Sequence, residues 1–182
     1  VMLFASKFGL ALVMSMAVCC VYAAEPGEHF DPKGKPPSSF TKDVLRKAAT
    51  TLPLADKRDF EEQAKGFIAP AESSKIMADD GHVAWDMERF QFLNGSTGFD
   101  SVDPSLHRIS MLNMNYGLYE VIPGIYQVRG FDLADISFVR GKKGWIVIDP
   151  LTSEEPARAA LALFQKHVGK GLPVTAVIYS HS

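Results

Sequence analysis

The fold of this chain is decided by residues 117–150, GLYEVIPGIYQVRGFDLADISFVRGKKGWIVIDP. Short runs of β-branched and aromatic residues alternate in this stretch with turn residues, which is typical of antiparallel strands joined by tight turns. The pattern predicts strands over 118–122, 125–128, 136–140 and 145–148, with turns at Pro123-Gly124 and at residues 141–144.

A different unit follows the last of these strands. The segment WIVID leads to Ser153 as an N-cap and then to a predicted helix, which carries Ala157, Leu161 and Phe164 on one face and stops at Gly169. A strand over residues 174–179 comes next, and strand-helix-strand crossovers make parallel neighbours. Because this second strand is apolar on both faces, we expect a sheet that is covered on both sides.

The preceding region, residues 41–116, is predicted to be mainly helical. Thr41 and Asp56 can each cap a helix, and Asp103-Pro104 has the N-cap and N1 pattern of a third. Residues 83–93 alternate in hydrophobicity, which predicts a strand or an extended loop. Residues 24–40 are rich in proline and glycine and have the composition of an extended linker.

Residues 1–23 have the pattern of a secretory signal peptide. Lys7 precedes an apolar run over residues 8–18, and small or apolar residues close the segment. The run is shorter than the ~20 apolar residues of a bilayer span, so we expect cleavage near Ala23 or Ala24, no stable membrane span afterwards, and a periplasmic or secreted protein. A retained anchor or lipidation at Cys19 or Cys20 stays open as an alternative.

Composition restricts the function only slightly. The chain is 47% hydrophobic and 22% charged, which is ordinary for a soluble globular protein. Its formal net charge of −2 gives no basic footprint, so we expect no nucleic-acid partner. Both cysteines lie in the predicted signal segment, which excludes a disulfide framework in the mature chain.

Two polar residues stand at the carboxyl ends of the two predicted parallel strands, where sheets of this kind place ligands and catalytic groups. His181 directly follows an apolar strand, so it is a candidate metal ligand held on a rigid element, although a histidine in this place can also be a simple capping residue. Asp149 ends the preceding strand before Pro150. It is either a turn-forming residue or an indirect support for a metal-bound histidine.

Three stretches together resemble the N-terminal part of the linear alkylsulfatases. They are residues 117–161 (GLYEVIPGIYQVRGFDLADISFVRGKKGWIVIDPLTSEEPARAAL), 173–182 (PVTAVIYSHS) and 59–70 (DFEEQAKGFIAP). The resemblance covers residues 53–182 and is strongest from Gly117 onward.

This resemblance implies the metallo-β-lactamase fold, an α/β sandwich with αββα layers. Residues 117–182 would be the first part of that domain, preceded by the helical N-terminal extension. It also implies a His-x-His-x-Asp-His motif that holds two zinc ions, with His181 as the first histidine and the second directly after Ser182. No catalytic residue is then expected within residues 1–182, and this polypeptide alone is expected to be inactive.

For the complete parent protein, the resemblance implies hydrolysis of alkyl sulfate esters such as dodecyl sulfate to an alcohol and sulfate, and a homodimer. Two other readings stay open. The same fold hosts many reactions, so the substrate could be a lactam, thioester or phosphoester. Alternatively, the chain could belong to an exported binding or scaffold module in which His181 is structural and holds no metal.

Overall fold

The computed structural model of the protein describes residues 34–181. The predicted signal peptide, its cleavage site and most of the predicted linker lie outside these residues. The chain divides into two units, residues 1–35 and 36–182, and all the elements below belong to the second. None of the helices within residues 34–181 is long and apolar enough to cross a bilayer.

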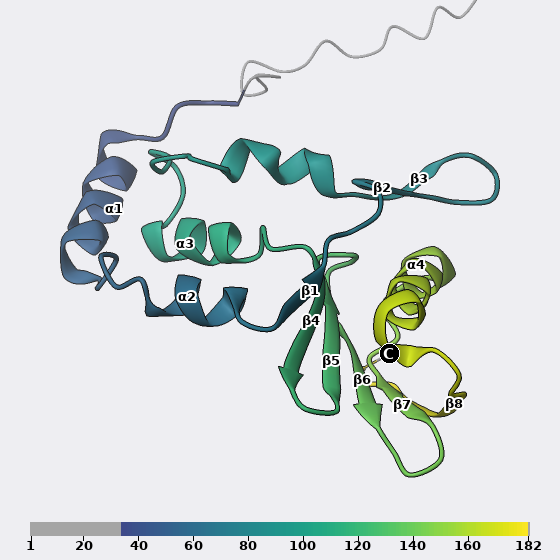
Figure 1. The fold of residues 1–182 in the computed structure, drawn as a ribbon. Helices are drawn as coiled ribbons and strands as arrows, with labels where there is room; N and C mark the ends of the chain where they lie inside the picture. The colour runs from purple at the N-terminus through teal and green to yellow at the C-terminus, as the bar shows by residue number, and fades with distance from the viewer. Residues whose placement is uncertain (1–33, 182) are drawn as a thin grey trace, which may run out of the picture. The chain divides into compact units, whose positions relative to one another are not determined.

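Two helices open the described part of the chain, and half of its strands later follow one another as one consecutive run, with the last helices before the final strand (Figure 1). The helices are α1 (Ser39–Thr51), α2 (Arg58–Ala64), the 3-10 helix η1 (Met87–Leu93), α3 (Pro104–Leu112), α4 (Glu154–Phe164) and the π-helical turn η2 (Gln165–Gly169). The strands are β1 (Phe67–Ala69), β2 (Lys75–Met77), β3 (Val83–Asp86), β4 (Gly117–Ile122), β5 (Ile125–Arg129), β6 (Ile136–Arg140), β7 (Trp145–Ile148) and β8 (Val174–Ile178).

Six of the strands form one sheet in the order β1-β4-β5-β6-β7-β8, and β2 pairs with β3 in a separate ribbon. Neighbours from β1 to β7 are antiparallel, whereas β7 and β8 are parallel. The Pro123-Gly124 turn that joins β4 to β5 is as tight as predicted, because Ile122 pairs with Ile125 and Gly124 takes a φ of 86°. The predicted crossover is also confirmed, since α4 connects the two parallel strands.

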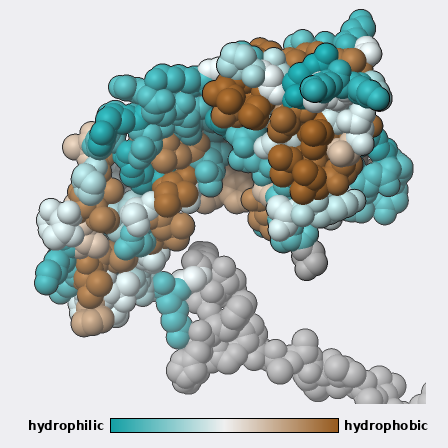
Figure 2. Space-filling view, turned by 90° about the horizontal axis from the view of Figure 1, so that it is seen from below, coloured by the Kyte–Doolittle hydropathy of each residue, from teal (hydrophilic) through white to brown (hydrophobic). Residues whose placement is uncertain are grey.

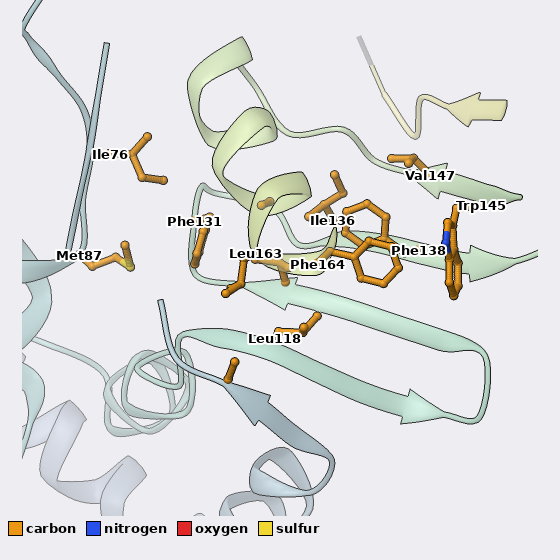
Figure 3. Packing of buried hydrophobic residues seen from close by; sticks show 13 residues of the cluster. Ile76, Met87, Leu118, Phe131, Ile136, Phe138, Trp145, Val147, Leu163 and Phe164 are labelled. Carbon is orange, nitrogen blue, oxygen red and sulfur yellow. The ribbon is translucent and has the colours of Figure 1, made fainter. Parts of the chain in front are cut away.

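The core lies between the sheet and α4 (Figure 3). Phe138 of β6 and Phe164 of α4 are fully buried, and their rings stack with centroids 4.0 Å apart and planes 5° from parallel. The Trp145 ring meets Phe164 edge-on at 4.8 Å. Aromatic pairs of this kind add about 0.5–1.5 kcal/mol to the burial of their area, so this cluster fixes the position of α4 on the sheet.

The opposite face of the sheet is apolar but less covered. Ile146 and Ile148 of β7 are half-buried, and Ile178, which pairs with Ile148 from β8, is 51% exposed. Every residue of β8 is exposed, so residues 34–181 do not supply the cover on both sides that the apolar strand predicts. Figure 2 shows apolar residues gathered in patches on one surface of the described part.

The predicted N-caps of the first two helices are each displaced. Helix α1 is capped by Ser38, whose Oγ accepts the Thr41 backbone N–H at 3.1 Å, so Thr41 lies in the first turn and not at the cap. Asp56 stands one residue before the Lys57 cap of α2, yet its carboxylate still accepts the Arg58 N–H at 2.9 Å. The third prediction is confirmed: Asp103 caps α3 and Pro104 begins it.

Two further predictions differ from the structure. Residues 83–93 are a strand only as far as Asp86, because the Asp86 side chain accepts the Glu88 N–H and starts the helix η1. On α4 the predicted face of Ala157, Leu161 and Phe164 is shifted by one position. The buried residues are Pro156, Ala160, Leu163 and Phe164, because the stacking of Phe164 on Phe138 turns this stripe toward the sheet.

Candidate metal centre

The parallel pairing of β7 and β8 brings Asp149 and His181 to the same edge of the sheet. Ile148 pairs with Ile178, and the Asp149 backbone N–H donates to the Ile178 carbonyl at 2.9 Å, which extends the pairing beyond the ends of both strands. The two residues that the sequence placed at the carboxyl ends of these strands are therefore neighbours.

Ser180 links the two side chains. Its hydroxyl donates to Oδ2 of Asp149 at 2.8 Å, and its Oγ lies 2.6 Å from Nδ1 of His181. The Asp149 Oδ2 atom itself is 3.8 Å from the same Nδ1. The imidazole is 61% exposed and the Asp149 side chain only 20%, so the carboxylate lies beneath a ring that faces outward.

This arrangement favours a proton on Nδ1 of His181. A serine hydroxyl has one hydrogen, and when Ser180 donates it to the Asp149 carboxylate, Ser180 Oγ accepts from Nδ1–H of His181. In the neutral imidazole Nε2 then keeps its lone pair, and it makes no hydrogen bond to any residue of the described part. A histidine that donates Nδ1–H to an oxygen and presents Nε2 has the chemistry of a metal ligand.

The described residues supply one such ligand and no complete set. No group of three or more His, Cys, Asp or Glu side chains arranged to hold a metal occurs within residues 34–181. A catalytic zinc takes about three protein ligands and an open position. The donor chemistry of His181 therefore fits one ligand position of a zinc site.

The loop after β7 is held by Asp132, a residue that the sequence reasoning missed. Its side chain is buried, and Oδ2 accepts both the Thr152 backbone N–H, at 2.7 Å, and the Thr152 hydroxyl, at 2.5 Å. Within this loop Asp149 and Leu151 have positive φ angles of 57° and 70°. An aspartate soon after an apolar strand was the available signal, but nothing in the sequence indicated that it would reach residue 152.

Asp135 is a second acidic residue near this edge that the sequence did not single out. It directly precedes β6, and its Oδ1 accepts the Gly130 N–H at 3.3 Å. Asp135 is exposed by its surface area, but the protein around its carboxyl partly removes hydration and so raises its pKa, with a smaller contribution from the Asp149 charge, while the Gly130 bond and Arg129 act in the opposite direction. Asp135 also borders a cavity of about 720 Å³ that Trp85, Tyr116 and Arg129 help to line.

The other described histidines lie elsewhere. His82 contacts Asp80 in the loop between β2 and β3, with Nδ1 2.5 Å from Oδ1. His107 is buried in α3, where its Nε2 lies 2.7 Å from Ser96 Oγ, and His167 is in η2. Within residues 34–181, His181 is therefore the histidine that combines a strand-end position with an open ring nitrogen.

Comparison with known proteins defines the class of this fold. Residues 129–182 match the model of the metallo-beta-lactamase superfamily. A solved structure, that of the stereoselective inverting sec-alkylsulfatase Pisa1 from Pseudomonas sp., superimposes with a TM-score of 0.72 at 44% sequence identity, over 81% of this chain and 23% of that one. The chain thus has the first part of the metallo-β-lactamase fold, as its sequence predicted.

Within that superfamily its relatives are alkylsulfatases. The chain is 45% identical over 148 residues to an (R)-specific secondary-alkylsulfatase of Pseudomonas sp., and 44% identical over 149 residues to a linear primary-alkylsulfatase of Pseudomonas sp.. It is 38% identical over 134 residues to the alkyl/aryl-sulfatase BDS1 of Saccharomyces cerevisiae. These matches cover 74–81% of this chain but only 21–22% of each relative.

Proposed function

We propose that this chain is part of an exported, zinc-dependent alkylsulfatase that hydrolyses alkyl sulfate esters, such as dodecyl sulfate, to an alcohol and inorganic sulfate. The observation that carries the proposal is 45% identity to an (R)-specific secondary-alkylsulfatase over 148 residues, which is 81% of this chain. The chain is similar both to a primary-alkylsulfatase and to a secondary-alkylsulfatase, so the proposal covers primary and secondary alkyl sulfates alike.

In this proposal His181 is one zinc ligand, through Nε2. Ser180 Oγ accepts the hydrogen bond from Nδ1–H and, with Asp149, keeps the ring in the tautomer that leaves Nε2 unprotonated. When bound, zinc lowers the pKa of water to about 7 and offsets negative charge on an anionic ester. The remaining ligands and the pocket for the alkyl chain would come from other parts of the complete protein.

The test is His181→Ala in the complete protein. Loss of a ligating imidazole should lower both zinc content and sulfate release from dodecyl sulfate. Asp149→Asn is the matched comparison, because it keeps the size of the side chain. In this proposal it affects zinc only by changing how the His181 imidazole is oriented. We expect it to cost about 10- to 100-fold in zinc affinity or activity, which is less than the loss in His181→Ala.

Three outcomes separate the alternatives. Normal zinc content and a normal sulfatase rate in His181→Ala would show that the ligand assignment is wrong. Zinc binding by the wild type with no hydrolysis of any alkyl sulfate would favour another reaction of the same fold. A wild type that binds no zinc would favour a binding or scaffold module.

Export is a separate part of the proposal, supported by the apolar run at residues 8–18 behind Lys7. We expect the mature protein to begin at Ala24 or Glu25 and to be periplasmic or secreted. Intact-mass analysis of the protein from its native host is the measurement. Retention of residues 1–23 on a cytosolic protein would contradict the prediction.

A further inference from the structure

Asp132 is a buried charge with an unusual set of partners. Burial of a carboxylate is costly unless hydrogen bonds replace its hydration. Here Oδ1 accepts the Leu133 N–H at 2.6 Å, and Oδ2 accepts both the backbone N–H and the hydroxyl of Thr152. Two of its three donors therefore come from a single residue in the loop between β7 and α4, twenty positions further along the chain.

That loop has a backbone that needs external support. Asp149 and Leu151 both adopt positive φ, which is unfavourable for residues with a side chain, most of all for Leu151, and persists only where the surroundings hold it. The Asp149 N–H is bonded to the Ile178 carbonyl at one end of this short segment. Thr152, bonded to Asp132, is the fixed point at the other end.

The same segment sets the position of the Asp149 carboxylate. Because the side chain of a residue with positive φ points in a direction that ordinary strand geometry does not reach, relaxation of the loop would redirect it. The carboxylate would then move away from Ser180, and Nδ1 of His181 would lose the hydroxyl orientation that fixes its tautomer.

We propose that Asp132 is a positioning residue of the metal edge: through Thr152 it holds the β7–α4 loop so that Asp149 and Ser180 orient His181. This inference rests on the proposed function, because it assigns Asp132 a role toward zinc. The alternative is that Asp132 only anchors the loop before α4 and contributes to stability. In a positioning role, substitution of Asp132 lowers zinc affinity more than its loss of stability accounts for. In a purely stabilising role, it does not.

The experiment uses the complete protein and three variants at the contact. Asp132→Asn removes the charge and leaves one oxygen acceptor, Thr152→Val removes the hydroxyl at nearly constant volume, and Thr152→Ser restores it. The probes are Zn²⁺, by competition with a chelator, and Co²⁺, by the visible spectrum of the substituted site. Thermal unfolding is measured alongside without metal.

We expect Asp132→Asn to lower zinc affinity about 10-fold, at the lower end of the range for partners that orient a ligand, and to shift the Co²⁺ bands. Thr152→Val should show a smaller change in the same direction, and Thr152→Ser should stay close to the wild type. If Asp132→Asn does not fold, the pair of Thr152 variants decides the question, because neither alters a charge.

A core variant, Leu163→Ala, serves as the control for lost stability, because Leu163 is a buried core residue of α4 and takes no part in the Asp132–Thr152 or Asp149–Ser180 hydrogen bonds. The inference fails if Leu163→Ala lowers zinc affinity as much as Asp132→Asn at a similar loss of melting temperature. It fails equally if the wild type binds zinc and Asp132→Asn binds it as tightly with an unchanged Co²⁺ spectrum. A wild type that binds no zinc would instead overturn the proposed function on which the inference rests.

Discussion

The two faces of the six-stranded sheet are built from the same strands but differ in how far their side chains are buried. On the face toward α4, Val128, Phe138 and Phe164 have no exposed surface. On the other face, Ile146 and Ile148 are half-buried and Ile178 is half-exposed. Successive side chains of a strand point to opposite faces, so the apolar residues along these strands supply both faces of the sheet.

The difference shows that the apolar pattern encodes two interfaces, of which the described residues complete one. Helix α4 closes the first face, as Phe164 demonstrates by stacking on Phe138. The second face has aliphatic side chains of the kind that belong in a core, without a full layer over them. This is what the αββα sandwich implies, because its two sheets pack with their faces about 10 Å apart.

The largest expected effect is the behaviour of residues 24–182 expressed alone. With one sheet face and the β8 edge exposed, this segment should self-associate and show no cooperative thermal transition. The complete protein should unfold cooperatively. A cooperative transition together with monomeric sedimentation of residues 24–182 would contradict the idea that the second face needs a covering layer.

On the closed face we expect Phe164→Ala to lower the free energy of unfolding of the complete protein by about 3–5 kcal/mol. The ring is fully buried against both Phe138 and Trp145, so its removal leaves a cavity. Urea denaturation with an unchanged m-value measures the loss. If Phe164→Ala lowered the free energy of unfolding by no more than a substitution at an exposed position does, α4 would not be fixed to the sheet through this ring.

On the other face Ile148→Ala tests whether the complete protein buries what residues 34–181 leave half-buried. If a second layer packs there, the change should cost at least about 2 kcal/mol. If the face meets solvent, the cost should stay within about 0.5 kcal/mol. The control is Val121→Ala, which replaces a 46% exposed aliphatic residue near the far end of β4.

The smallest effect concerns Asp135, which precedes β6 at the same edge as Asp149. Partial loss of hydration around the carboxyl raises its pKa above the ordinary 3.8, although the residue is exposed by its surface area. The folded state therefore holds this proton more tightly than the unfolded chain does, and the stability that Asp135 contributes at low pH is lost as pH rises through its folded pKa.

Asp135→Asn should remove this dependence, so the variant should gain melting temperature relative to the wild type as pH rises above 3.8 into the weakly acidic range. Melting curves of both proteins across that range give the difference. Parallel curves would show that Asp135 does not have a raised pKa. Glu155→Gln is a control of opposite sign, because the Ser153 hydroxyl lowers the pKa of Glu155.

The sequence predicted the sheet well because its signals are local. The Pro123-Gly124 turn, the Asp103-Pro104 helix start and the apolar strands need only near neighbours to form, and the structure confirms all of them. The start of α1 was displaced because Ser38 is as suitable a cap as Thr41, and that of α2 because Asp56 bonds the Arg58 N–H from one residue before the cap position. The buried stripe of α4 was displaced because it depends on Phe138, a residue of another element.

The candidate site was predicted only in part for the same reason. Asp149 and His181 were found because each follows an apolar strand. The Ser180–Asp149 and Asp132–Thr152 contacts were not, because they join residues far apart in the sequence and depend on the tertiary fold. The role of His181 as a ligand stays a prediction. So do the proposed boundaries after residues 23, 40 and 116, since the superfamily match begins inside the last segment, at residue 129.

The pairing of β1 with β4 has a consequence for the order of folding. It pairs Phe67 with Tyr119, so forming this contact closes a long loop of chain between them. The β4–β5 hairpin, in contrast, closes a loop of two residues. The entropy of closing a loop grows with its length, so contacts between distant residues form late. We expect the hairpins and the α4 crossover to form first and the N-terminal helices to join them last, which also makes that region the first to detach when the protein opens.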